Sequence, residues 1–360
     1  MITKIIFGEN TFEKLFLELE EANCKKPLLI CGKHFQLTKQ FNLFKSKIKN
    51  FELFDSIEPN PKVSSVNSAA ELLNKTKCDC VIGIGGGSVL DVAKVVAIMK
   101  DFEKSCEEFY VSFEQVKKVV PFFALPTTSG TGSEATKYSV LTLSSKIKQT
   151  LRSEKLYAKI AIVDPELTYS MSSSLTATTG LDAFCQAIES YWSVNSTEET
   201  KGFAKESIQL AFSSLVKAVN SPDVSSRRNM ALASITGAKA FDYTGTTACR
   251  SISYSFTQMY GLPHGFAVAL TVPWFLEFYS KAREKECLEI CSFINAKSIS
   301  EAREKIVSLM KEVKAPVCLK EIGCRKKDFE KIISQSLSQK PNNPRQHTRE
   351  DIQRMLEELF

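Results

Sequence analysis

Residues 81–94 read VIGIGGGSVLDVAK, an apolar run followed by three glycines and a helical pattern. The apolar run at 81–84 predicts a strand covered on both faces, because polar residues do not alternate with apolar ones. Glycines at 85–87 let the backbone turn tightly and approach a ligand closely, and the free amides of the following helix attract phosphate. The stretch predicts an α/β domain with a phosphate-binding loop. Its spacing departs from GxGxxG, and a plain strand-to-helix turn is the alternative.

The alternation of strands and helices extends to both sides of this loop. Apolar runs at 25–33, 119–128 and 159–166 predict further buried strands of a parallel sheet, and helical spacing recurs around 35–50, 64–77 and 89–101. From about residue 176 the chain changes to long amphipathic stretches with little strand character. We therefore predict an α/β domain at 1–175 and an all-helical domain at 176–360.

A second polar loop, PTTSGTGSE at 126–134, follows the predicted strand at 119–125. Hydroxyl groups at the carboxyl end of a parallel strand are placed to donate hydrogen bonds into a ligand crevice. A solvated Ser/Thr turn is the alternative. Two such loops in one sheet favour the ligand site.

Composition narrows the class of protein. The 47 basic and 41 acidic residues give a net charge of +6 that is scattered along the chain, so no nucleic-acid partner is expected. No apolar run approaches the roughly 20 residues that span a bilayer, and no signal pattern opens the sequence, so we expect a cytoplasmic protein without a membrane partner. Eleven cysteines without a CxxC pair suit reduced thiols rather than a disulfide framework.

Motifs along the whole chain resemble those of the iron-dependent alcohol dehydrogenases. They are GGGSVLDVAK (85–94), ALPTTSGTGSEAT (124–136), VDPELT (163–168) with TTGLDAFCQAIESY (178–191), LPHG (262–265) and NNPR (342–345). Residues 190–197, 246–257 and 260–271 look most like the phosphonoacetaldehyde reductase, or 2-hydroxyethylphosphonate dehydrogenase, branch. The resemblance implies the dehydroquinate synthase-like fold, an α/β dinucleotide-binding domain followed by a helical domain, and we expect a homodimer acting on a small molecule.

The resemblance also implies which residues bind the cofactor, NAD or NADP. The pyrophosphate would be held by Gly85, Gly86, Gly87 and Ser88. Further cofactor contacts would come from Asp91, one helical turn beyond the loop, and from Thr127, Thr128 and Ser133. Many NAD-preferring members carry an acidic residue after the strand that here ends at Cys31, but this chain has Gly32 and Lys33. Loss of that carboxylate removes repulsion toward a 2′-phosphate, and Lys33 could attract one, so we expect NADPH to be used at least as well as NADH.

The family's divalent metal, iron or zinc, is held by an aspartate and three histidines, and two of these positions have changed. They are occupied here by Asp182, Gln186, Arg250 and His264. Arginine offers no lone pair and its charge opposes a cation. Asp182, Gln186 and His264, with waters, would hold a metal only weakly, so a bound metal is doubtful.

The catalytic candidates are His264, Arg250 and Tyr254. Arg250 is either the electrophile that stabilises charge on a carbonyl oxygen, an anchor for an anionic substrate group, or a structural filler paired with Asp182. His264 is the first candidate for proton delivery and Tyr254 the alternative. We expect an NAD(P)-dependent reductase that converts a small anionic aldehyde, such as phosphonoacetaldehyde, to the alcohol. The alternatives are another small alcohol dehydrogenase of the family, dehydroquinate-synthase-like or glycerol-phosphate-type chemistry, and a dinucleotide-binding protein that has lost catalysis.

Overall fold

The computed structural model describes residues 3–102, 104–108, 116, 118–145 and 147–360. Internal packing divides the chain into two compact units. The first comprises Met1–Thr128 and Gly132–Tyr169, and the second comprises Ser129–Thr131 and Ser170–Phe360. A tripeptide from the polar loop at 126–134 is thus packed with the second unit.

The first unit contains a parallel sheet that, within the described residues, has the strand order β1-β8-β5-β4-β2-β3. Its strands are β1 (Lys4–Phe7), β2 (Pro27–Cys31), β3 (Glu52–Phe54), β4 (Cys80–Gly85), β5 (Phe122–Pro126) and β8 (Ile160–Val163). The central strands β2, β4 and β5 are buried along their whole length, as continuous apolar runs predict.

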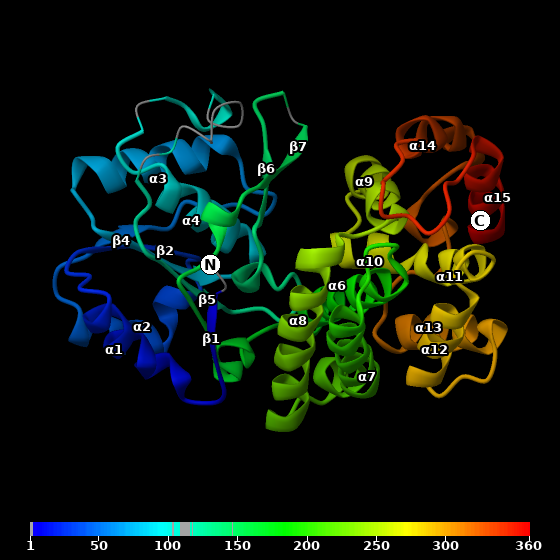
Figure 1. Cartoon of the computed structure of the whole chain (residues 1–360), viewed down its shortest axis with the longest axis horizontal. Coiled ribbons are helices and arrows are strands. Elements are labelled where there is room, and N and C mark those ends of the chain that lie inside the picture. The colour runs from blue at the N-terminus through cyan, green and yellow to red at the C-terminus, as the bar shows by residue number, and fades with distance from the viewer. Residues whose placement is uncertain (1–2, 103, 109–115, 117, 146) are drawn as a thin grey trace. The chain divides into compact units, whose positions relative to one another are not determined.

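Helices cover both faces of this sheet (Figure 1). They are α1 (Lys14–Glu21), α2 (Lys39–Lys47), α3 (Val63–Lys75) and α4 (Gly87–Ile98). Helices α1 and α2 pack on the face that carries Ile82, and α3 and α4 on the face that carries Val81, because successive side chains of a strand point to opposite faces.

An antiparallel hairpin, β6 (Tyr138–Thr142) and β7 (Lys148–Arg152), was not expected from the sequence. Its strands are short and carry several polar residues, so they lack the continuous apolar run that marks the central strands. Short 3-10 turns complete the first unit at Thr11–Glu13, Phe35–Leu37, Ser133–Ala135, Glu154–Leu156 and Pro165–Thr168.

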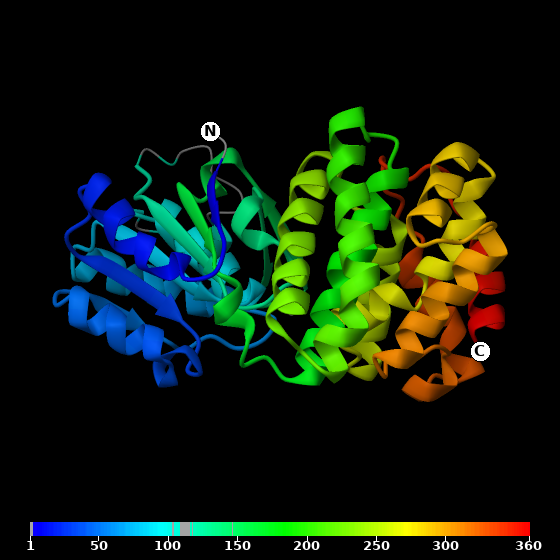
Figure 2. The same cartoon turned by 90° about the horizontal axis from the view of Figure 1, so that it is seen from below.

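The described residues of the second unit form helices and no strands. The helices are α6 (Ser173–Trp192), α7 (Glu198–Asn220), α8 (Val224–Thr244), α9 (Ala248–Tyr260), α10 (His264–Ala269), α11 (Val272–Ser280), α12 (Glu284–Phe293), α13 (Ile299–Glu312), α14 (Phe329–Ser336) and α15 (Arg349–Leu359), with 3-10 turns at Lys320–Ile322 and Lys326–Asp328. The long helices α6, α7 and α8 pack side by side (green in Figure 2). The predicted fold class, a parallel α/β unit followed by a helical unit, is confirmed.

Local sequence explains where these helices begin and how closely they pack. Capping boxes start α7 at Thr197 and α8 at Asp223, where side chains satisfy amides that have no helical acceptor. Helix α10 lies so close to α6 that a Cβ atom on Gly265 would be 1.8 Å from the carbonyl oxygen of Thr178. The glycine of LPHG is therefore required by packing. Among the described residues, no helix is both long and apolar enough to cross a bilayer.

Candidate active site

The glycine loop joins the end of β4 to the start of α4. Gly85 ends the strand, and Gly86 precedes the helix without a side-chain cap. The amides of Gly87 and Ser88 lie in the first turn of α4, where an α-helix offers no acceptor for them. A Cβ atom on Gly86 would lie 3.3 Å from the Thr128 side chain, so the space beside the loop is narrow. This cradle of backbone donors fits a pyrophosphate.

The loop after β5 runs directly alongside the glycine loop. The Thr127 amide donates to the carbonyl of Gly85 over 3.0 Å, and the side chains of Thr127 and Thr128 are half-buried. These two threonines therefore lie beside the glycine loop.

Asp91 and Ser133 bind each other. The Ser133 hydroxyl donates to Asp91 Oδ1 over 2.7 Å, and the Val140 amide donates to Asp91 Oδ2 over 2.9 Å. Burial raises the pKa of Asp91, while Lys94 and these two donors act to lower it. Both carboxylate oxygens thus have protein partners, so we propose that Asp91 and Ser133 position the loop after β5.

Lys94, in the same helix, supports that loop from the interior. Its fully buried ammonium donates to the carbonyl oxygens of Thr136 and Tyr138 over 2.7 and 2.8 Å. A buried charge requires such partners to offset its lost hydration. The end of the GGGSVLDVAK motif therefore holds the segment that directly follows the second polar loop.

In the second unit, Arg250 of α9 lies among the side chains expected at the metal position. Its Nη2 atom is 2.6 Å from Asp182 Oδ1 and 3.5 Å from Gln186 Oε1, and its Nε donates to Glu189 Oε2 over 3.2 Å. The Asp182 contact is an ion pair without hydrogen-bond alignment. The three α6 residues are spaced i, i+4 and i+7, so they share one helix face.

The contact between Arg250 and His264 shows which nitrogen of the imidazole ring accepts a hydrogen bond. His264 Nε2 lies 3.0 Å from Arg250 Nη1, and His264 Nδ1 lies 3.4 Å from the Ser253 hydroxyl oxygen. A guanidinium can only donate, so Nε2 accepts and the proton of a neutral ring is on Nδ1. The ring of Tyr254 stacks on the ring of His264, and the two ring centroids are 5.9 Å apart. Tyr254 is 37% exposed.

The charges of this group compensate one another. Burial raises the pKa of Glu189, which is fully buried, and the charge of Arg250 opposes that effect. Burial acts to lower the pKa of Arg250, but Asp182 and Glu189 outweigh it and raise that pKa. Burial lowers the pKa of Lys340. The charge of Glu189 acts to raise that pKa, and the charge of Arg250 acts to lower it. Lys340 is therefore a second cation within electrostatic range of the group.

The residues at this position do not fit a divalent metal ion. Arg250 contacts Asp182, Gln186 and His264, the side chains that would otherwise face the ion. The Gln186 amide nitrogen, moreover, donates to the carbonyl of Gly130 over 2.9 Å. A guanidinium that occupies the ligand atoms also repels a cation, so we derive no chemical step through a metal here.

Glu189 and Lys340 were missed at the sequence level. Glu189 has a detectable signal, because it follows Asp182 by seven residues and Gln186 by three on one helix. Lys340 lies after α14 and far from α6 in sequence, with no local spacing that relates it to Glu189. Its proximity depends on the tertiary fold.

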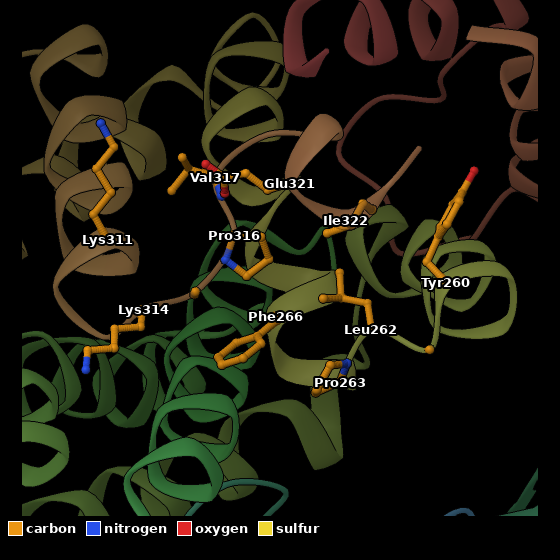
Figure 3. Close-up of a pocket in the computed structure, with 12 residues that line it drawn as sticks. Tyr260, Leu262, Pro263, Phe266, Lys311, Lys314, Pro316, Val317, Glu321 and Ile322 are labelled. Atoms are coloured by element: carbon orange, nitrogen blue, oxygen red, sulfur yellow. The ribbon is translucent and has the colours of Figure 1, made fainter. Parts of the chain in front are cut away.

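An open hollow of about 820 Å³ lies elsewhere on the helical unit (Figure 3). It is lined by Leu262, Pro263, Phe266, Lys311, Lys314 and Pro316, among others. Arg250, Tyr254 and His264 are not among its lining residues. The predicted catalytic residues thus form a separate group.

Two family models divide the chain between them. Iron-containing alcohol dehydrogenase matches residues 3–165, and the C-terminal part of the Fe-containing alcohol dehydrogenase family matches residues 176–360. The chain belongs to the iron-containing alcohol dehydrogenase family. Membership makes it an enzyme, a nicotinamide-dependent oxidoreductase of alcohols and aldehydes.

Several relatives in the iron-containing alcohol dehydrogenase family match this chain over most of its length. The NAD-dependent methanol dehydrogenase of Bacillus methanolicus is 29% identical, over 98% of this chain and 96% of its own. Long-chain-alcohol dehydrogenase 1 of Geobacillus thermodenitrificans is 32% identical, over 80% and 76%. The structure of sulfoacetaldehyde reductase from Bifidobacterium kashiwanohense in complex with NAD+ has a TM-score of 0.94 at 29% identity, covering 99% of this chain and 96% of that one.

Proposed function

We propose that this enzyme reduces a short aldehyde bearing an anionic group, with phosphonoacetaldehyde to 2-hydroxyethylphosphonate as the specific reaction. The observation that carries the reductase activity is Arg250, a buried guanidinium that can polarise a carbonyl and is held where the family resemblance places a metal ligand. Similarity to a sulfoacetaldehyde reductase supports the substrate class, because sulfonate and phosphonate are both tetrahedral oxyanions. Lys340 supplies a further positive charge near Arg250 for that group.

The first unit would hold the cofactor through the amides of Gly87 and Ser88, with Gly85 and Gly86 allowing the close approach. When bound, a reduced nicotinamide supplies the hydride. Thr127 and Thr128 line the same loop region. We propose NADPH as the preferred form, since Gly32 carries no carboxylate to repel a 2′-phosphate.

Arg250 is best suited to polarise the carbonyl. Its Nη1 atom carries two N–H bonds and has one hydrogen-bond partner within the described part of the chain, His264. One donor therefore remains for an oxygen that gains negative charge during reduction. A two-pronged grip on a phosphonate would require Arg250 to release Glu189 or Asp182. The geometry thus favours the electrophile over the anion anchor.

Tyr254 is the better candidate for the proton donor. The His264 proton is on Nδ1, which faces Ser253, and Nε2 is engaged by Arg250. Burial raises the pKa of Tyr254, although Arg250 acts to lower it, so its phenol stays protonated at neutral pH. We therefore place Tyr254 before His264, which reverses the order expected from sequence.

The proposal is tested by steady-state kinetics on enzyme treated with a chelator. Phosphonoacetaldehyde and sulfoacetaldehyde would be compared with propionaldehyde, each with NADPH and NADH. We expect kcat/KM about tenfold or more higher for the anionic aldehydes, as one added charge contact of about 1.4 kcal/mol implies, and no loss on chelation. Preference for the neutral aldehyde would refute the substrate class. Activity that chelation abolishes and zinc or iron restores would refute the role of Arg250.

A further inference from the structure

A compact group of ligand-type side chains lies at the other end of β4 from the glycine loop. Cys24 follows helix α1, Asp79 precedes β4, and Cys80 begins β4, whose far end is Gly85. At about 3.3 Å per strand residue, the group is roughly 16 Å from the glycine loop. It belongs to neither the cofactor cradle nor the Arg250 group, and the inference drawn from it does not depend on the proposed function.

The three side chains are close enough to bind one ion. Each offers one ligand atom, a thiol sulfur from Cys24 and Cys80 and a carboxylate oxygen from Asp79, and these atoms lie within 4.8 Å of one another. Zinc bonds of about 2.0–2.3 Å in a tetrahedron separate ligand atoms by roughly 3.5 Å, so small side-chain rotations suffice. We propose that Cys24, Asp79 and Cys80 form a binding site for a thiophilic divalent cation such as zinc.

The backbone around the group is fixed by hydrogen bonds. The Cys24 amide donates to the carbonyl of Leu19 over 2.9 Å, which closes the end of α1 after Asn23 at φ 54°. Cys80 pairs with Pro27 in the parallel register of β4 and β2. The two thiols are therefore held by the end of a helix and the start of a central strand, which limits the cost of ordering them around an ion.

The Asp79 carboxylate is oriented by two consecutive amides. The Lys25 amide donates to Oδ2 over 2.8 Å, and the Lys26 amide donates to Oδ1 over 3.0 Å. Such donors behind a ligating carboxylate orient it and are a usual part of metal sites. Each oxygen keeps a second lone pair for an ion.

The chemistry of the thiols suits a cation that displaces protons. Cysteine binds a metal ion as the thiolate, so each of the two thiols must lose its proton. Binding would break both S–H bonds, release two protons and form two metal–sulfur bonds, with no change of oxidation state. Three protein ligands leave a fourth position for water. Cys80 is buried and Cys24 is half-buried, so an ion reaches the site from the Cys24 side.

The test is a titration of the reduced, chelator-treated full-length protein with cadmium and with zinc. Cadmium binding is followed by the ultraviolet charge-transfer band of thiolate–cadmium bonds, and zinc binding by competition with a chromophoric chelator. We expect one equivalent to bind at this site with release of two protons. The variants Cys24→Ser and Asp79→Asn should each weaken binding about tenfold or more.

Cys318→Ser is the matched control, because it removes another half-buried thiol, in the second unit, and should leave binding unchanged. Cys24 is half-buried, so Cys24→Ser keeps the test valid even if a Cys80 variant fails to fold. Unchanged metal binding by Cys24→Ser, absence of a thiolate–cadmium band in the wild type, or a Cys24–Cys80 disulfide that persists under reducing conditions would each overturn the proposal. Loss of zinc binding in Cys24→Ser would support this site without bearing on the proposed function. Loss of zinc binding only in Asp182→Asn would instead place the ion among Asp182, Gln186, Arg250 and His264, and would overturn the proposal.

Discussion

Arg250 is the most informative residue to change, because its permanently charged guanidinium contacts Asp182, Glu189 and His264. Arg250→Ala should lower kcat/KM by about 10²–10³, equivalent to about 2.7–4 kcal/mol, because one donor to the developing oxyanion is lost. Steady-state kinetics on the aldehyde measures this loss. The exposed Arg325→Ala is the control. A loss below tenfold in a folded Arg250→Ala enzyme would make Arg250 a structural filler.

Gly32 decides cofactor preference in our interpretation. The wild type should use NADPH at least as well as NADH, and Gly32→Asp should shift the ratio of kcat/KM toward NADH by about tenfold or more through repulsion of the 2′-phosphate. A Cβ atom at Gly32 meets nothing within 4 Å, so the variant should fold. Gly202→Asp adds the same charge at another open glycine and should change nothing. Strong NADH selectivity in the wild type would contradict the argument.

Glu134 makes stability depend on pH. It is 2% exposed, and burial raises its pKa from 4.5 to about 7, against its own backbone amide and Lys94. The folded state therefore binds the proton more strongly than the unfolded chain. Its contribution to stability is present below pH 4.5 and is lost as pH rises toward 7, by about 3 kcal/mol in total.

Glu134→Gln should remove this dependence. Urea unfolding at pH 5 and at pH 8 would show the variant gaining stability relative to the wild type at the higher pH. The exposed Glu206→Gln serves as the comparison. Equal pH dependence in wild type and Glu134→Gln would show that folding does not raise the pKa of Glu134, which would contradict the prediction.

At the scale of elements, the start of α4 is the feature that a cofactor would recognise. Gly86→Val places a branched side chain against Thr128, where a Cβ atom already lies 3.3 Å away, and over the amides of Gly87 and Ser88. Nucleotide affinity should fall about tenfold or more while the fold survives, since the φ of Gly86 is −73° and suits any residue. Calorimetry measures the affinity, with Gly202→Ala, at an open glycine outside the cofactor site, as control. Unchanged binding would refute the cradle.

Elements with a strong local pattern were predictable, and those defined by distant contacts were not. The strands β2, β4, β5 and β8 follow from apolar runs, and the helical texture after residue 176 follows from amphipathic spacing. The strand β1 and the hairpin β6–β7 are short and partly polar, so their pairing depends on neighbours from elsewhere in the chain. The grouping of Asp182, Gln186, Arg250 and His264 came from family resemblance, and the Arg250–Glu189 ion pair was found only in three dimensions.

At the scale of the whole molecule, the tripeptide Ser129–Thr131 packs with the second unit although its neighbours in the sequence belong to the first. Gly130 packs against Thr179 of α6, where a Cβ atom would lie 2.6 Å from the threonine Cβ, and its carbonyl accepts from Gln186. A boundary drawn at residue 175 assigns the tripeptide to the other unit. The hydrophobic pattern of the sequence could not predict this packing, because the tripeptide lies between two elements of the first unit, β5 and the turn at Ser133–Ala135.

Gly130→Ala should therefore destabilise the protein by about 1–3 kcal/mol, the usual cost of overpacking. The effect should appear in urea unfolding of the full-length chain, monitored by tryptophan fluorescence, since both Trp192 and Trp274 lie in the second unit. Gly202→Ala, at an open position, is the control. Equal midpoints for Gly130→Ala and wild type would show that the backbone yields easily at this contact.

Strand β1 is an edge strand of the sheet, and its pairing with β8 keeps the more apolar β8 inside. Strand β8 has the sequence IAIV and is buried, and β1 covers its outer edge through four paired positions. Removing Lys4–Phe7 would leave β8 as the edge strand, with unpaired backbone donors and acceptors, the usual template for intermolecular strand addition. We therefore expect a variant that lacks Lys4–Phe7 to aggregate more than the wild type, which light scattering of the expressed protein would measure.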